Sequence, residues 1–73
     1  MEDNRYYDFV NRLNTTLEEK GMTQRELAEK TGMPEGTISR YCSGKRVPNA
    51  MQILTIAKAL NVKTDYLIFN KQE

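Results

Sequence analysis

The stretch from Thr23 to Cys42, which reads TQRELAEKTGMPEGTISRYC, is the feature that most constrains the fold of this chain. Thr23 and Glu26 have the spacing of a capping box, in which each side chain bonds the backbone N–H of the other residue, so a helix is predicted to start directly after Thr23. Ala28 is small enough for a second helix to cross closely over the first. Gly32 can adopt the positive φ that ends a helix without a Cβ clash. The stretch therefore predicts two short helices joined by a tight turn.

The second helix of this pair has one apolar side. Pro34, with its φ already fixed and no N–H, is suited to open the helix. Ile38 and Tyr41 are three residues apart and form the apolar stripe that is expected to face the core. The outer side is left to Glu35, Gly36, Ser39 and Arg40, with Thr37 at the flank. The helix is thus predicted to present small, polar and charged residues to its surroundings.

Before this pair, apolar residues recur at spacings of three and four, which predicts an amphipathic first helix from Arg5 to Lys20. Its apolar stripe consists of Tyr6, Phe9, Val10, Leu13 and Leu17. Gly21 is expected to close this helix at its C′ position, and Met22 to pack as the hydrophobic residue before the next cap. Residues 1–4 are polar and are expected to fray.

After the pair, residues 43–48 interrupt the helical pattern and predict a turn and a loop. Asn49 is a good N-cap for a fourth helix, and Asn61 can take the left-handed conformation at its end. The apolar stripe of the fourth helix consists of Ile53, Ile56, Ala57 and Leu60. A short last helix is expected to seat Val62, Tyr66 and Leu67 on the core. The prediction is an all-α, compact five-helix bundle over residues 1–73 as a single domain, with residues 70–73 as a tail.

The spacing of Ala28, Gly32 and Ile38 resembles the helix-turn-helix of the phage-repressor and Cro-like (Xre-type) family of DNA-binding domains. Downstream, Gly44-Lys45-Arg46-Val47-Pro48 and Asp65-Tyr66-Leu67 resemble the loop and the last helix of that family, so the resemblance runs from about Leu13 to Leu67. The first trio alone is a weak signal, whereas the trio with both downstream motifs is a strong one. The resemblance implies a lambda-repressor-like fold and double-stranded DNA as the partner.

Charge is unevenly distributed along the chain, although the formal net charge is only +1. Residues 36–64 carry no acidic residue and five basic ones, namely Arg40, Lys45, Arg46, Lys58 and Lys63. The net charges of residues 1–35, 36–64 and 65–73 are therefore −3, +5 and −1. This polarisation fits a surface that faces phosphates. A solvated lysine-rich face with no partner is the alternative.

Several classes of function are disfavoured by what the sequence lacks. It has no apolar run long enough for a bilayer and no basic-then-apolar leader, so we expect a cytoplasmic protein that does not contact a membrane. A single cysteine, Cys42, excludes an internal disulfide, and the absence of histidine argues against a zinc site and removes the usual catalytic base. No glycine-rich phosphate loop is present. We therefore expect no enzymatic activity, no cofactor and no small-molecule ligand.

Three residues match the positions at which members of the resembled family read bases. Arg40 is the first candidate, because an exposed Arg can donate two hydrogen bonds to guanine O6 and N7; a solvated Arg paired with a nearby acid is the alternative. Glu35 and Gly36 both depart from the amides or small polar residues common in the family. Glu35 either accepts from cytosine N4 or only favours the helix dipole. Gly36 either marks a close backbone approach to the groove or is neutral, with specificity arising from DNA shape.

Contacts that position the protein on the DNA backbone are assigned, from the same resemblance, to Gln24, Thr37, Ser39, Lys45, Arg46 and Asn49. Gln24 stands at a helix start, where backbone N–H groups and its own amide can meet a phosphate, and in the family this residue also braces the first recognition residue. Thr37 is a candidate for a phosphate or thymine-methyl contact, or is only a surface residue. The loop residues lie where family members grip the backbone. Leu17 and Cys42 stand where some phage repressors place a buried ion pair, so an apolar contact is expected there and Cys42 is assigned to the core.

Four apolar residues remain once the core stripes are assigned: Met51, Leu54, Ile68 and Phe69. They predict a homodimer surface, or else two or three of them complete the core. The resulting hypothesis is a sequence-specific transcriptional repressor, which binds as a homodimer to a palindromic operator with half-sites about one helical turn, or roughly 34 Å, apart. The alternative keeps the fold but makes the chain a protein-interaction module, such as an antitoxin-like partner.

Overall fold

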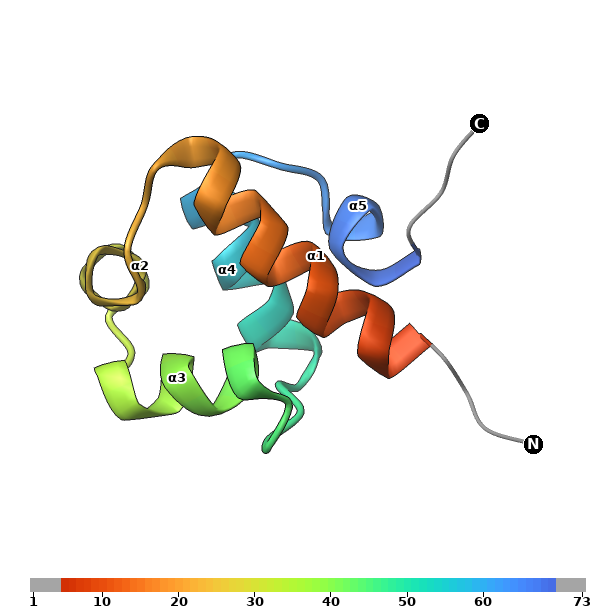
Figure 1. Cartoon of the computed structure of the whole chain (residues 1–73), viewed down its shortest axis with the longest axis horizontal. Coiled ribbons are helices and arrows are strands. Elements are labelled where there is room, and N and C mark those ends of the chain that lie inside the picture. The colour runs from red at the N-terminus through yellow and green to blue at the C-terminus, as the bar shows by residue number, and fades with distance from the viewer. Residues whose placement is uncertain (1–4, 70–73) are drawn as a thin grey trace.

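The computed structural model describes the backbone of residues 5–69 and the side chains of residues 8–68. Five helices follow one another along this part of the chain (Figure 1): α1 (Arg5–Lys20), α2 (Gln24–Thr31), α3 (Glu35–Ser43), α4 (Ala50–Leu60) and α5 (Thr64–Phe69). No strand occurs between residues 5 and 69, so the predicted all-α class and its five helices are confirmed. The expectations of a frayed start at residues 1–4 and a tail at residues 70–73 lie outside the described residues.

The helix boundaries follow the predicted capping signals. Thr23 Oγ1 accepts from the Glu26 N–H at 3.0 Å, and the Glu26 carboxylate accepts from the Thr23 N–H at 2.8 Å, which completes the capping box of α2. Gly32 ends α2 with a φ of +76°. A second capping box, which the sequence analysis did not anticipate, joins Asn49 and Gln52 at the start of α4 through bonds of 2.9 and 2.8 Å.

Pro34 was expected to be the first residue of its helix, but it lies one residue before the helix starts. Its φ of −61° and ψ of 143° are extended, so it is the N-cap and α3 begins at Glu35. The Pro34 carbonyl accepts from the N–H groups of Thr37 and Ile38 at 3.0 and 3.2 Å, which makes it the first acceptor of the helix. Because proline has no side-chain acceptor, α3 starts without a side-chain cap.

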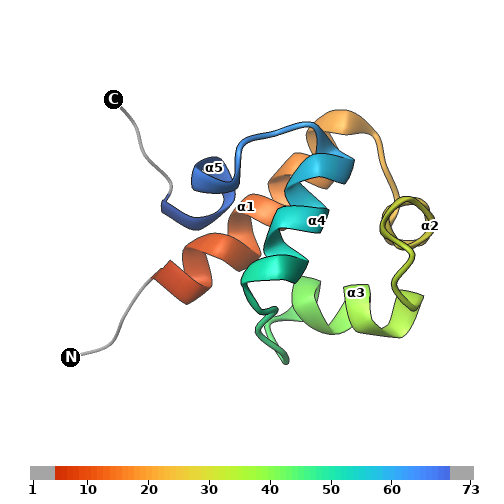
Figure 2. The same cartoon turned by 180° about the vertical axis from the view of Figure 1, so that it is seen from behind.

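The core lies between α1 and the other helices. α1 packs against α3, α4 and α5, while α2 packs against α3 and α4. Figure 2 shows from behind that the start of α1 and the end of α5 lie on the side opposite α2. The buried core consists of Phe9, Leu13, Leu17, Leu27, Ala28, Ile38, Tyr41, Cys42, Ile56, Ala57, Leu60 and Leu67. The predicted stripes are therefore confirmed, with Val10, Ile53, Val62 and Tyr66 half-buried against this core.

One polar residue in this core was not predicted from the apolar pattern. Thr16 is 1% exposed, and its buried hydroxyl has no hydrogen-bond partner among the described residues. The side chain of Tyr6, assigned to the stripe of α1, lies outside the described residues. The described part of the chain contains no helix long and apolar enough to cross a membrane.

Candidate nucleic-acid interface

α3 divides sharply into a buried side and an exposed side. Ile38 and Tyr41 are 0% exposed and Cys42 is 7% exposed, so these three side chains hold the helix against the core. The opposite side carries the exposed residues Glu35, Gly36, Ser39 and Arg40, while Thr37 at the flank is half-buried. The outward face is therefore the predicted one. Gly36 and Ser39 in this outward face carry little side-chain bulk, which suits a helix that enters a groove.

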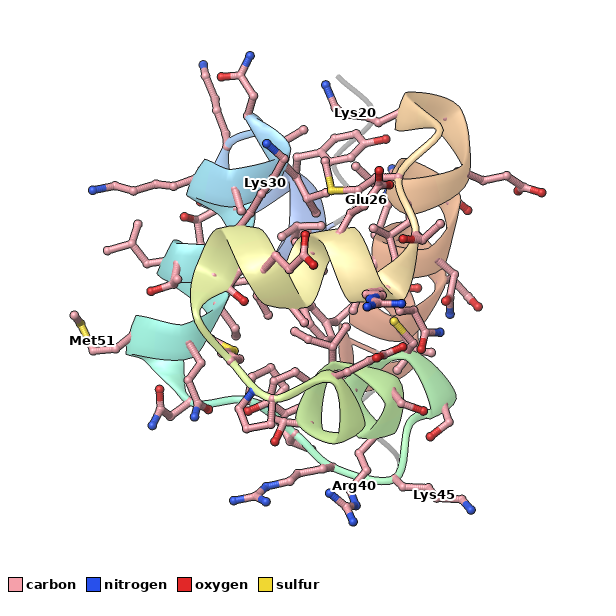
Figure 3. The ribbon with its side chains drawn as sticks, turned by 90° about the vertical axis from the view of Figure 1, so that its left-hand side faces the viewer. Lys20, Glu26, Lys30, Arg40, Lys45 and Met51 are labelled. Atoms are coloured by element: carbon pink, nitrogen blue, oxygen red, sulfur yellow. The ribbon has the colours of Figure 1, made fainter. Side chains whose placement is uncertain are left out.

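The Arg40 side chain is available for an external partner. In Figure 3 it extends from α3 at the same edge of the molecule as Lys45, away from the core. No described carboxylate is within salt-bridge distance of it; the salt bridge found among the described side chains joins Arg25 and Glu29 at 4.0 Å. A Cβ placed on Gly36 would meet Arg40 Nη1 at 3.8 Å. The guanidinium therefore lies beside the face of the helix that Gly36 leaves without a side chain.

The loop after α3 is fixed to the end of that helix. The backbone N–H groups of Lys45 and Arg46 both donate to the Arg40 carbonyl, at 2.9 and 3.3 Å. Both basic side chains are exposed, as is Asn49 at the start of α4. Asn49 Oδ1 is occupied by the capping box, so its Nδ2 is the donor that remains for an external acceptor.

Gln24 occupies the first position of α2 and is half-buried. Glu35 is the exposed first residue of α3. Within the described part of the chain no hydrogen bond joins the two side chains, so the bracing that the resemblance implies is not formed in this structure. Gln24 still stands at a helix start, next to N–H groups that have no partner inside the helix.

A second exposed surface is apolar. Met51 is 69% exposed and Leu54 is 39% exposed, so these two side chains do not complete the core of the described chain, and their place in a dimer surface stays a prediction. Val47, in the loop before α4 as predicted, is a further exposed apolar residue, with 63% of its surface exposed. Ile68 is half-buried, and the side chain of Phe69 lies outside the described residues.

Cys42 belongs to the core, as predicted. It is 7% exposed, and desolvation by burial raises the pKa of its thiol to about 11. The thiol is therefore protonated at neutral pH and is a poor nucleophile. Leu17, the other residue of the pair expected to be apolar, is 6% exposed.

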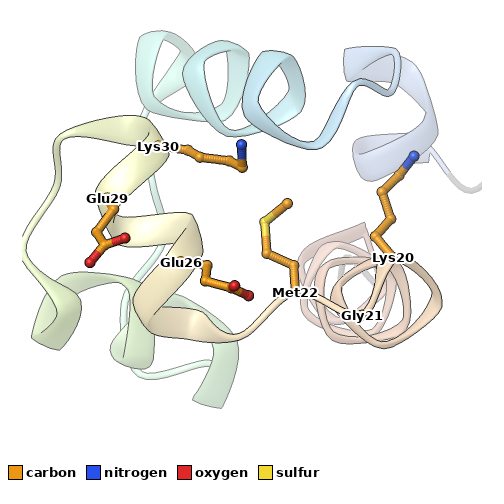
Figure 4. A pocket seen from close by; sticks show the side chains of 6 residues that line it. All are labelled: Lys20, Gly21, Met22, Glu26, Glu29 and Lys30. Carbon is orange, nitrogen blue, oxygen red and sulfur yellow. The ribbon is translucent and has the colours of Figure 1, made fainter.

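A surface hollow lies between the end of α1 and the outer side of α2 (Figure 4). Its lining consists of Lys20, Gly21, Met22, Glu26, Glu29 and Lys30. Figure 3 places Lys20 and Lys30 at the edge opposite Arg40 and Lys45, so the hollow is not part of the interface around α3. No group of His, Cys, Asp or Glu side chains suited to a metal ion occurs in the described portion of the chain.

Two short helices with a closely packed turn, the second exposing a polar face beside a basic loop, define the helix-turn-helix class of domain. The helix-turn-helix family model matches residues 13–67, and the chain belongs to this family, whose Xre-type branch it resembles.

Comparisons with individual proteins point to the same class. The chain is 41% identical over 56 residues to the HTH-type transcriptional regulator for conjugative element SXT of Vibrio cholerae, which covers 77% of this chain and 26% of that protein. It is 35% identical over 57 residues to the HTH-type transcriptional regulator ImmR of Bacillus subtilis, which covers 78% of this chain and 45% of ImmR. It thus spans less than half the length of these two relatives.

Among solved structures, the chain is similar to the restriction-modification controller protein C.AhdI from Aeromonas hydrophila. The sequence identity is 27% and the TM-score is 0.81, with coverage of 86% of this chain and 96% of that protein. The two chains therefore share one fold over most of their lengths.

Proposed function

We propose that this chain is a sequence-specific double-stranded DNA-binding module of a transcriptional regulator, which reads the major groove with the exposed face of α3. The observation that carries the proposal is the exposed Arg40, which pairs with no described carboxylate and lies at one edge with Lys45, on a helix whose other side is buried. Arg46, which follows Lys45 in the same loop, is also exposed. This arrangement offers a bidentate donor for a base next to cations for the flanking phosphates. The relatives named as transcriptional regulators support the same class of function.

Within this proposal, Arg40 binds the O6 and N7 atoms of guanine. Glu35, at the amino end of α3, and Gly36 face the base pairs nearer the start of the helix. Positioning contacts with the sugar-phosphate backbone are made by Gln24, Thr37, Ser39, Lys45, Arg46 and Asn49. The acid-free segment of residues 36–64 supplies the positive field that attracts the duplex.

We further propose that the protein acts in the cytoplasm as a homodimer that represses transcription by occupying a palindromic operator. The exposed side chains of Met51 and Leu54, three residues apart on α4, support association, because burying them against a second copy would remove apolar surface from water. Ile68 and Phe69 are proposed to belong to the same surface. Two copies related by a two-fold axis would place their α3 helices in half-sites about 34 Å apart.

In vitro selection from a pool of random duplexes tests the proposal. The wild-type chain should enrich a palindromic motif that contains a guanine in each half. Arg40→Ala should cost about 1–3 kcal/mol of binding free energy and relax the preference at that base pair alone. Failure of the wild type to enrich any motif would favour the protein-interaction alternative, and an unchanged motif with Arg40→Ala would refute the assignment of α3 as the recognition helix.

A further inference from the structure

The carboxyl end of α3 is held by two different kinds of bond. The carbonyl groups of Arg40 and Tyr41 accept backbone N–H groups of the following loop, at distances of 2.9 to 3.3 Å. The Cys42 carbonyl instead accepts from the side chain of a different helix, at a distance of 2.9 Å from Asn14 Nδ2 in α1. Such terminal carbonyl groups have no partner within their own helix. Asn14 therefore supplies an external restraint on the end of the recognition helix.

The amide of Asn14 is itself fixed by α1. Its Nδ2 atom carries two hydrogens and also donates to the Val10 carbonyl, one turn earlier, at 3.0 Å. One N–H thus binds its own helix while the other reaches Cys42 in α3. An aspartate has nearly the same shape but, when ionised, only acceptors, so it would turn negative oxygens toward both carbonyl groups.

We infer that Asn14 is a positioning residue for DNA reading, which sets the placement of α3 relative to α1 and hence of Arg40 in the groove. The inference rests on the proposed function, since it concerns how α3 meets the bases. Arg40 and Cys42 lie in the last turn of the same short helix, so a shift at the Cys42 carbonyl is transmitted directly to Arg40.

The consequence is a loss of discrimination rather than a general loss of binding. Asn14 is exposed and is not one of the core residues, so its substitution opens no cavity in the core. Bidentate bonds from Arg40 to a base require close geometry, whereas the attraction of Lys45 and Arg46 to phosphates tolerates small displacements. Loss of the Asn14 bond should therefore weaken binding to the operator more than binding to unrelated duplexes, and leave the salt dependence unchanged.

The experiment compares Asn14→Asp with Asn11→Asp. Asn11 is exposed one turn earlier on α1 and forms no side-chain hydrogen bond with a described residue, so its variant adds the same charge without breaking the link to α3. Fluorescence anisotropy would measure Kd for the selected operator and for a scrambled duplex of the same composition, at several salt concentrations. Circular dichroism would fix a temperature at which every variant is folded.

We expect Asn14→Asp to lower the ratio of specific to nonspecific affinity by about tenfold. A loss of this size lies within the discrimination that one bidentate contact to a base provides. Asn11→Asp should keep the wild-type ratio. Asn14→Ala removes the same bond without adding charge and should also lower the ratio, which keeps the test decisive if Asn14→Asp does not fold. Ile56→Val, a buried change in α4, should lower the melting temperature while leaving the ratio unchanged.

The outcomes separate this inference from the proposed function. Equal ratios for the wild type and both Asn14 variants would overturn the positioning role alone. A reduced ratio in Ile56→Val as well would also overturn it, since general destabilisation would then explain the effect. A wild-type protein that does not distinguish the two duplexes would overturn the proposed function itself.

Discussion

Replacement of Thr16 by valine should stabilise the fold. Thr16 is 1% exposed, and its Oγ1 forms no hydrogen bond within the part of the chain that the structure describes. Valine keeps the branched shape and removes the hydroxyl, whose unpaired burial costs about 1–3 kcal/mol in mutational data. The two residues have similar helix propensities, so this cost should appear almost fully as a gain in the free energy of unfolding. In a domain of this size, each 1 kcal/mol raises the melting temperature by roughly 4–8 °C.

The chain offers a matched control at the adjacent position. Thr15 is exposed, so Thr15→Val should change the free energy of unfolding by no more than about 0.5 kcal/mol. Thr16→Ser keeps the hydroxyl but deletes a buried methyl group, and should destabilise the fold by about 1 kcal/mol. Thermal and urea unfolding, followed by circular dichroism without DNA, would give all three values.

The reasoning fails if Thr16→Val and Thr15→Val unfold at the same temperature and denaturant concentration. Such a result would show that the Thr16 hydroxyl finds a partner in solution. Removal of the hydroxyl would then break a bond instead of relieving an unpaired group.

Three further predictions concern the DNA-binding and apolar surfaces. Lys45→Ala should lower the slope of log affinity against log salt by about 1. Lys30→Ala, at the opposite edge of the molecule, should leave this slope unchanged. If Lys45→Ala has the same slope as the wild type, Lys45 does not contact a phosphate. Gly36→Ala should raise stability by roughly 1 kcal/mol, since the new Cβ would meet only one guanidinium nitrogen at 3.8 Å, yet weaken DNA binding; wild-type affinity would dismiss a close backbone approach to the groove. Met51→Asp should reduce the dimer fraction in analytical ultracentrifugation, and unchanged sedimentation would exclude the surface around Met51 and Leu54 as the interface.

Most of the fold could be predicted because its signals are local. The capping box at Thr23, the left-handed residues Gly32 and Asn61 and the apolar spacings within each helix all act within a few residues of the chain. These signals determine where each helix begins and ends and which side it buries. The capping box between Asn49 and Gln52, three residues apart, is equally local, although only the N-cap role of Asn49 was predicted.

What the sequence could not provide depends on how the helices pack. Thr16 is buried because α1 is covered by three other helices, so its buried sector is wider than the apolar stripe alone indicates. The bond from Asn14 joins residues 28 positions apart, and no local pattern announces it. The candidate base-reading residues were placed on the correct face, since the burial of Ile38 and Tyr41 fixes the opposite side of α3. Their roles toward DNA remain predictions.

The residues proposed for base reading and for phosphate binding are joined through the backbone of Arg40. The side chain of Arg40 projects toward the proposed bases, while its carbonyl accepts the N–H groups of Lys45 and Arg46 at 2.9 and 3.3 Å. A displacement of the end of α3 is therefore expected to move the Arg40 side chain together with the loop that carries Lys45 and Arg46. Phosphate contacts fix the register of a protein on DNA. If Lys45 and Arg46 bind phosphates as proposed, the bonds from their N–H groups to the Arg40 carbonyl would therefore also set the position of Arg40 along the base pairs.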